Sequence, residues 1–255
     1  MLLDEWRIRA RREGIFERTR GSARENSQRR RPALQFPCHP ERSRGIPGNY
    51  LEVMPRDSST PLRVARNDIS AVLLTGGESH RMGEDKATLL VRGKLLWHIQ
   101  LDLLRKLDPT EIFVSARTDP VWRPADVHFV GDDPPSRGPL SGVAASLAHT
   151  RTNHLLALAI DMPFMNEKYL AFLCSQVELG RGVIAKIKDR FEPLAAIYPR
   201  ESLASVQSAL SGTDFSLQTL ASRLAAEGKL QVIPVTSPER RLFLSVNEQA
   251  DLAAL

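Results

Sequence analysis

The sequence has few of the features that mark secreted, membrane-spanning or zinc-binding proteins. It has 255 residues and only two cysteines, Cys38 and Cys174, which are too few for a disulfide framework and too far apart for a zinc-binding pattern. No apolar run approaches the roughly 18 residues that a transmembrane helix needs, and no apolar signal region stands at the N-terminus. We therefore expect a protein of the reducing cytoplasm with no membrane partner.

Lysine is missing from the first quarter of the chain. Residues 1–68 contain 15 arginines and 9 acidic residues, a formal charge of +6, whereas residues 69–255 contain 20 basic and 21 acidic residues, a charge of −1. The first segment is also rich in proline and serine and shows no sustained hydrophobic period. We predict a disordered extension over residues 1–68 and one folded domain over residues 69–255.

Three interpretations of the extension stay open. An arginine-rich arm can bind nucleic acid. A mitochondrial targeting segment is a second interpretation, although nine acidic residues argue against it. The third is a tail without a role, which a start codon placed too early would produce; Met54 is one later start. We favour the tail, so nucleic acid is not an expected partner.

From Ile69 onward, short apolar runs alternate with stretches of helical spacing. Predicted strands cover residues 69–74, 111–116, 127–130, 154–160, 183–188, 193–198 and 230–235. Predicted helices cover residues 94–107, 142–149, 166–177 (with Asn166 as the cap), 200–210, 215–227 and a last segment after Asn247. This alternation predicts an α/β fold with a mostly parallel sheet, in which ligands bind beyond the carboxyl ends of the strands.

A glycine pair, Gly76-Gly77, ends the first predicted strand, and two cations, Arg81 and Lys86, follow it. Glycine tolerates positive φ and, without a Cβ atom, lets backbone N–H groups approach an anion closely. Nearby cations would neutralise part of the charge of a triphosphate. Neither the Gly-Lys-Ser/Thr of a Walker P-loop nor the G-x-G-x-x-G dinucleotide fingerprint occurs, so those two nucleotide sites are excluded.

The whole string from Leu73 to Ala87 resembles the N-terminal signature of the molybdenum cofactor guanylyltransferases. Four later segments resemble that family's further markers, in the same order: Gly138-Pro139-Leu140-Ser141-Gly142, Asp161-Met162-Pro163-Phe164, Glu192-Pro193-Leu194 and Phe243-Leu244-Ser245-Val246-Asn247. The resemblance covers residues 69–255. It implies a Rossmann-like three-layer sandwich of the nucleotide-diphospho-sugar transferase type.

The resemblance also implies an activity and a set of site residues. Members of the family use GTP and Mg²⁺ to transfer GMP to molybdopterin carrying molybdenum, with release of pyrophosphate. Enzymes that insert the finished cofactor are a further expected partner. The implied catalytic residues are Arg81, Lys86 and Asp161, with Asp161 as the Mg²⁺ ligand. The implied binding residues are Leu74, Thr75, Gly76, Gly77, Lys86, Ser115, Asp132 (or its neighbour Asp133), Asp161 and Asn247. Ser115 and Ser245 stand where the family tends to carry Asn.

Other activities fit the same residues. The chain could transfer CMP to the same cofactor, or a nucleotide to a sugar or alcohol phosphate. It could also bind a nucleotide without catalysis, or bind RNA through its basic extension. A phosphate acceptor is already a nucleophile at neutral pH, so the predicted mechanism needs no general base and no histidine is named as catalytic. Positioning and charge stabilisation would supply the rate.

Overall fold

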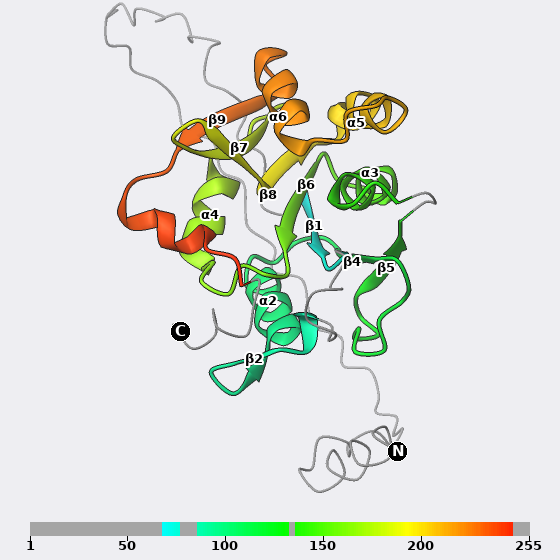
Figure 1. The fold of residues 1–255 in the computed structure, drawn as a ribbon, viewed down its shortest axis with the longest axis vertical. Helices are drawn as coiled ribbons and strands as arrows, with labels where there is room; N and C mark the ends of the chain where they lie inside the picture. The colour runs from blue at the N-terminus through cyan, green and yellow to red at the C-terminus, as the bar shows by residue number, and fades with distance from the viewer. Residues whose placement is uncertain (1–67, 77–85, 133–135, 247–255) are drawn as a thin grey trace, which may run out of the picture. The chain divides into compact units, whose positions relative to one another are not determined.

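The computed structural model describes residues 68–76, 86–132 and 136–246, all of which lie in the second of the two units into which the chain divides between Pro55 and Arg56. A seven-stranded sheet forms the centre of this unit (Figure 1). Its order is β5 (His128–Gly131), β4 (Ile112–Ala116), β1 (Ile69–Leu74), β6 (His154–Ala159), β8 (Arg190–Pro199), β7 (Gly182–Ile187) and β9 (Leu230–Pro234).

The sheet is parallel except at one strand. β1 pairs in parallel with β4 and β6, β4 with β5, and β7 with β9, whereas β8 runs antiparallel to both of its neighbours. The prediction of a mostly parallel sheet is therefore confirmed. The antiparallel β8 arises because residues 188–189 form a tight turn between β7 and β8, with Lys188 at φ 52°, and a turn this short can only join antiparallel strands.

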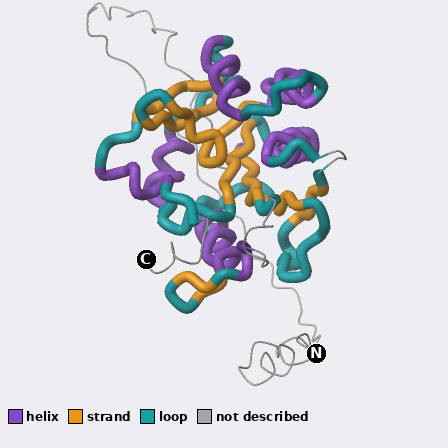
Figure 2. Tube along the Cα trace, in the orientation of Figure 1, coloured by secondary structure: helices purple, strands orange, loops and turns teal. Residues whose placement is uncertain are grey.

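Helices cover both faces of the sheet (Figure 2). One apolar cluster joins the sheet to α2 (Leu96–Arg105) and α4 (Glu167–Ser175), and a second joins it to α3 (Pro139–His149), α5 (Leu203–Leu210) and α6 (Leu217–Ala226). Alternate residues of β1 enter opposite clusters, Leu73 the first and Val72 the second, because successive strand side chains point to opposite faces. The result is the three-layer sandwich expected from the sequence.

Two helix boundaries differ from the predictions. Lys94 and Leu95 form the short strand β3, which pairs with β2 (Leu90–Val91) through a turn in which Arg92 and Gly93 both have positive φ, so α2 begins at Leu96 rather than Lys94. The helix predicted from Gly142 begins three residues earlier, with Pro139 in its first turn, where the missing N–H costs nothing.

The remaining predictions match the described residues closely. Asn166 caps α4 by accepting a 2.9 Å hydrogen bond from the Tyr169 N–H, as expected. Short 3₁₀ segments that were not predicted occur at η3 (Lys86–Thr88) and η5 (Pro238–Phe243), while η4 (Arg200–Ser202) forms the start of the helix predicted over residues 200–210. The helix predicted after Asn247 and the extension over residues 1–67 lie outside the described residues, and no described helix could cross a membrane.

Candidate active site

The predicted site residues gather at one edge of the sheet because the strands that precede them are parallel. β1, β4, β5 and β6 all end at this edge. Thr75 directly follows β1, Asp132 directly follows β5, and Asp161 lies two residues after the end of β6. The chain passes from β1 to β4 and β5 on one side, then to β6 on the other, so the direction of winding reverses between β1 and β6. Such a switch point is where open α/β sheets bind ligands.

Lys86 and Asp161 meet across this switch point. The Lys86 Nζ lies 3.7 Å from the Asp161 Oδ2, and each side chain keeps about a quarter of its surface exposed, 23% and 24%. Burial raises the pKa of the Asp161 carboxyl above its usual value, and the Lys86 ammonium beside it partly offsets that rise. Lys86 and Asp161, which are 75 residues apart in the sequence, thus form a partly buried ion pair that is open to solvent.

The segment that carries Asp161 is tied to three other parts of the fold. The Ile160 N–H donates to the Leu74 carbonyl at 3.0 Å, and the Val246 N–H donates to the Asp161 carbonyl at 2.9 Å. The fully buried Gln100 side chain donates from Nε2 to the Met162 carbonyl at 2.7 Å. β1, α2 and the segment after η5 therefore hold the backbone of this segment on both sides of the carboxylate.

Asp132 stands on the other side of β1 in a different environment. The Ser115 hydroxyl donates to its Oδ1 at 3.1 Å, and the Ser136 hydroxyl donates to its Oδ2 at 3.0 Å. Ser115 is 2% exposed and its carbonyl accepts from both the N–H and the hydroxyl of Thr75, each at 3.0 Å. Each carboxylate oxygen keeps acceptor capacity beyond its serine, so the group can accept two more hydrogen bonds from a ligand.

Gly76 borders this arrangement, and Gly142 allows its close packing. A Cβ atom on Gly76 would lie 3.5 Å from the Asp132 Oδ2, so the carboxylate borders the end of β1 directly. A Cβ atom on Gly142 would lie 2.5 Å from the Ser115 hydroxyl oxygen and 2.8 Å from a methyl carbon of Leu74, so only glycine lets α3 approach the ends of β1 and β4 this closely. The Gly-Pro-Leu-Ser-Gly segment thus packs against the ends of the strands that carry the site.

The described residues offer one carboxylate, not a cage, for a metal ion. No group of three or more His, Cys, Asp or Glu side chains within residues 68–76, 86–132 and 136–246 could surround an ion. Mg²⁺ typically binds proteins through one or two carboxylates and completes its shell with water and substrate phosphates. Asp161 is partly exposed, and burial raises its pKa more than the nearby Lys86 lowers it, so it fits that kind of site.

The structure therefore brings together seven of the predicted residues: Leu74, Thr75, Gly76, Lys86, Ser115, Asp132 and Asp161. Gly77, Arg81, Asp133 and Asn247 lie outside the described residues, so their predicted roles stay predictions. Ser136 and Gln100 were missed. A polar residue inside the apolar stripe of α2 was a usable signal for Gln100, whereas a serine that follows two prolines in the sequence gives none.

Comparison with protein families identifies the same region of the chain. The family model of the MobA-like NTP transferase domain matches residues 71–241. A probable molybdenum cofactor guanylyltransferase of Opitutus terrae is 32% identical over 186 residues, which cover 72% of this chain and 92% of the relative. A molybdenum cofactor guanylyltransferase of Pseudomonas fluorescens is 38% identical over 163 residues, 61% of this chain and 77% of the relative.

Solved structures share the fold at lower identity. Molybdopterin-guanine dinucleotide biosynthesis protein A from Archaeoglobus fulgidus matches with a TM-score of 0.59 at 21% identity, over 72% of this chain and 95% of the other. A 4-diphosphocytidyl-2C-methyl-D-erythritol synthase from Anaerococcus prevotii matches with a TM-score of 0.55 at 15% identity, over 74% and 94%. Proteins named for different bases thus share this fold, so the choice of base has to be argued from the site.

Proposed function

This chain belongs to the MobA-like NTP transferase family, and on that premise we propose that it is a molybdenum cofactor guanylyltransferase. It transfers GMP from GTP to molybdopterin carrying molybdenum and releases pyrophosphate. One observation of the structure supports this most directly. The ammonium of Lys86 and the carboxylate of Asp161 lie 3.7 Å apart at the switch point, at the same edge as Gly76 and Asp132.

The proposed binding mode uses both sides of β1. If neighbouring strands keep the usual spacing of about 4.8 Å, the ends of β5 and β6 are about 14 Å apart along the edge. The base would lie beside Asp132 and the phosphates between Gly76 and Lys86. Arg81 and Gly77 of the adjoining segment would add positive charge and backbone N–H donors, and Asn247 would contact the pterin.

Guanine recognition follows from the acceptors that Asp132 presents. Guanine offers two neighbouring donors, N1–H and the N2 amino group, and a carboxylate offers two acceptors in one plane. Cytosine and adenine each present a ring acceptor at the corresponding edge, which a carboxylate repels. The Ser115 and Ser136 hydroxyls orient Asp132 for this contact.

The chemistry needs positioning rather than a base. The terminal phosphate of the acceptor attacks the α-phosphorus of GTP in line, a new P–O bond forms, and the bond to the pyrophosphate oxygen breaks. Lys86 and Arg81 stabilise the charge that moves onto the leaving pyrophosphate. Asp161 would hold Mg²⁺, which supplies further neutralisation of the phosphate oxygens when bound. The reaction is expected in the cytoplasm.

The test is a pyrophosphate-release assay with Mg²⁺, molybdenum-loaded pterin and each of GTP, CTP, ATP and UTP, together with thermal shifts for the same four nucleotides. GTP should stabilise the protein and support turnover that EDTA abolishes. Stabilisation and turnover with CTP but not GTP would move the assignment to cytidylyl transfer. Nucleotide binding without pyrophosphate release would identify a binding protein without catalytic activity.

A further inference from the structure

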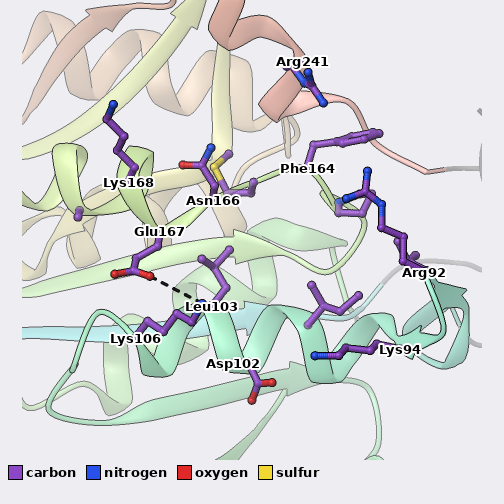
Figure 3. Close-up of a pocket in the computed structure, with 15 residues that line it drawn as sticks. Arg92, Lys94, Asp102, Leu103, Lys106, Phe164, Asn166, Glu167, Lys168 and Arg241 are labelled. Carbon is purple, nitrogen blue, oxygen red and sulfur yellow. Dashed lines mark ion pairs between the residues drawn. The ribbon is translucent and has the colours of Figure 1, made fainter. Parts of the chain in front are cut away.

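A groove between α2 and α4 lies apart from the predicted site residues. It encloses about 940 Å³, and α2 forms one wall with Leu103 and Lys106, while the segment from Pro163 to Lys168 forms the other (Figure 3). None of the predicted site residues within the described part of the chain lines it. Its nearest link to the site is Pro163, which follows Asp161 by two residues and is therefore within about 7 Å of it, Cα to Cα.

A second, separate hollow of about 80 Å³ shares Lys106, Glu167 and Ala171 with the lining of the groove. This hollow reaches Ile69, the first residue of β1, and Pro109, which precedes β4. Both positions are at the amino edge of the sheet, whereas Pro163 follows β6 at the carboxyl edge. The residues that line the two hollows therefore extend from the carboxyl edge to the amino edge of the sheet, about 20 Å for a six-residue strand.

The length and the floor of the groove indicate the kind of ligand. A small molecule would occupy only part of such a span, whereas about six residues of an extended peptide would fill it. The floor is aliphatic, with Val91, Ile99 and Leu103 among its residues. Two exposed apolar residues adjoin lining residues in the chain: Leu90, 62% exposed, precedes Val91, and Phe172, 41% exposed, follows Ala171.

The rim of the groove is strongly cationic. Two acids line it, and both already have basic neighbours: Asp102 lies 3.4 Å from His98 and 3.5 Å from Arg105, and Glu167 lies 3.8 Å from Lys106. The cations outnumber these acids by five to two, a local charge of +3 in a domain whose net charge is −1. The five cations are Arg92, Lys94, Lys106, Lys168 and Arg241.

We propose that this groove docks an acidic, apolar segment of a partner protein in extended conformation. Alternate apolar side chains would reach the aliphatic floor, and carboxylates would pair with the cations of the rim. A flat lipid surface could not reach the floor of a concave groove. If the proposed guanylyl transfer is correct, a protein docked here would lie beside the place where the acceptor arrives and the anionic product leaves.

The test selects the ligand without assuming its sequence. A library of random peptides displayed on phage is selected on the immobilised full-length chain in the absence of nucleotide, and enriched peptides are measured by fluorescence anisotropy. We expect enriched peptides to combine acidic with apolar residues and to bind more weakly as salt rises. Binding in the absence of nucleotide is independent of whether the chain transfers GMP, so the two proposals can fail separately.

Charge reversal locates the binding surface. Arg92→Glu combined with Lys168→Glu should weaken the peptides at least about tenfold, since like charges face each other across the groove. The matched control is Lys188→Glu combined with Arg151→Glu. It makes the same change in net charge at exposed residues outside the groove, and Lys188 has the same backbone conformation as Arg92, with φ 52° and 51°. This control should leave the affinity within about twofold.

Four results would overturn the proposal. Enriched peptides could show no excess of acidic residues, or could bind the groove variant and the control variant equally. An oligouridylate could bind more tightly than any peptide with the same sensitivity to Arg92→Glu and Lys168→Glu, which would assign the groove to nucleic acid. Sedimentation could show a dimer that the groove variant abolishes, which would assign it to a second copy of the chain.

Discussion

Two aspartates at the same edge of the sheet, Asp132 after β5 and Asp161 after β6, have opposite surroundings. Two serine hydroxyls hold the Asp132 carboxylate in place. Asp161 has no such pair of hydroxyl donors among the contacts of the described residues; an ammonium lies 3.7 Å away, and burial raises its pKa. A fixed acceptor suits recognition of a base by directed hydrogen bonds, whereas an under-neutralised carboxylate suits a cation. The difference in surroundings thus separates the site into a recognition side at Asp132, which would bind the base, and a charge side at Asp161 and Lys86, which would bind the cation and the phosphates.

The largest effect is expected on the charge side. Asp161→Ala should lower kcat/KM for pyrophosphate release about a thousandfold, the upper end of what loss of one preorganised charge contact costs. Asp189→Ala, at an exposed turn, is the matched control and should change activity less than about twofold. Near-normal activity of Asp161→Ala, with the circular dichroism spectrum unchanged, would place the metal site elsewhere.

Substitution of Lys86 should have the next largest effect, a loss of activity of about a hundredfold. Lys86→Ala removes the cation that faces the triphosphate and should reduce kcat more than it weakens GTP binding, because charge moves onto the leaving group in the transition state. Lys86→Arg should recover part of the loss. Equal losses in Lys86→Ala and Lys86→Arg would mean that shape rather than charge matters at this position.

On the recognition side, Asp132→Asn should weaken GTP binding about tenfold to a hundredfold, since a paired contact to a base edge contributes about 1–3 kcal/mol. The affinity for inosine triphosphate (ITP), which lacks the N2 amino group, should fall less in this variant, so the ratio of GTP affinity to ITP affinity should shrink. Calorimetric titration with both nucleotides measures this ratio, and Ser115→Ala should shrink it by a smaller factor. If Asp132→Asn left this ratio unchanged, the base would not bind beside Asp132.

The smallest effect is on stability, and it should differ in sign between the two aspartates. The raised pKa of Asp161 means that the folded state binds its proton more tightly than the unfolded chain does. Stability is therefore lost as pH rises from the ordinary Asp value through the raised one. Asp161→Asn should then slightly raise the melting temperature at pH 7, an advantage that fades in acid.

Asp132→Asn should lower the unfolding free energy by about 1–3 kcal/mol, because it weakens two hydrogen bonds to a charged group. Urea melts at pH 7 and pH 4 check both signs.

Much of the site could be predicted because strand ends are predictable. Once residues 69–74 and 154–160 were recognised as buried parallel strands, the residues that follow them had to share an edge, and Lys86 and Asp161 do so. The β2–β3 hairpin was missed because Leu95, Leu96 and Ile99 also fit helical spacing, and the signal for the turn, Arg92-Gly93, is weaker than Asn-Gly or Asp-Gly.

Other features depended on distances that a sequence does not contain. Ser136 donates to Asp132 from four residues along the chain, a contact that no sequence pattern predicts. The groove exists because α2 and α4, which are more than 60 residues apart, pack side by side on one face of the sheet without filling the space between them. Its five cations come from four separate places along the chain, and no local pattern groups them.

The hydrogen bond from Gln100 to the Met162 carbonyl makes α2 a shared part of two surfaces. Ile99 and Leu103, which flank Gln100 on the helix, line the groove, while Gln100 itself holds the segment that ends β6 and carries Asp161. Any ligand that displaces this helix will also displace the carboxylate, so occupancy of one surface should be detectable as altered turnover at the other. A substitution on α2 would alter both binding in the groove and turnover at the site. Charge changes at Arg92 on the hairpin and Lys168 on α4 therefore separate the two effects best.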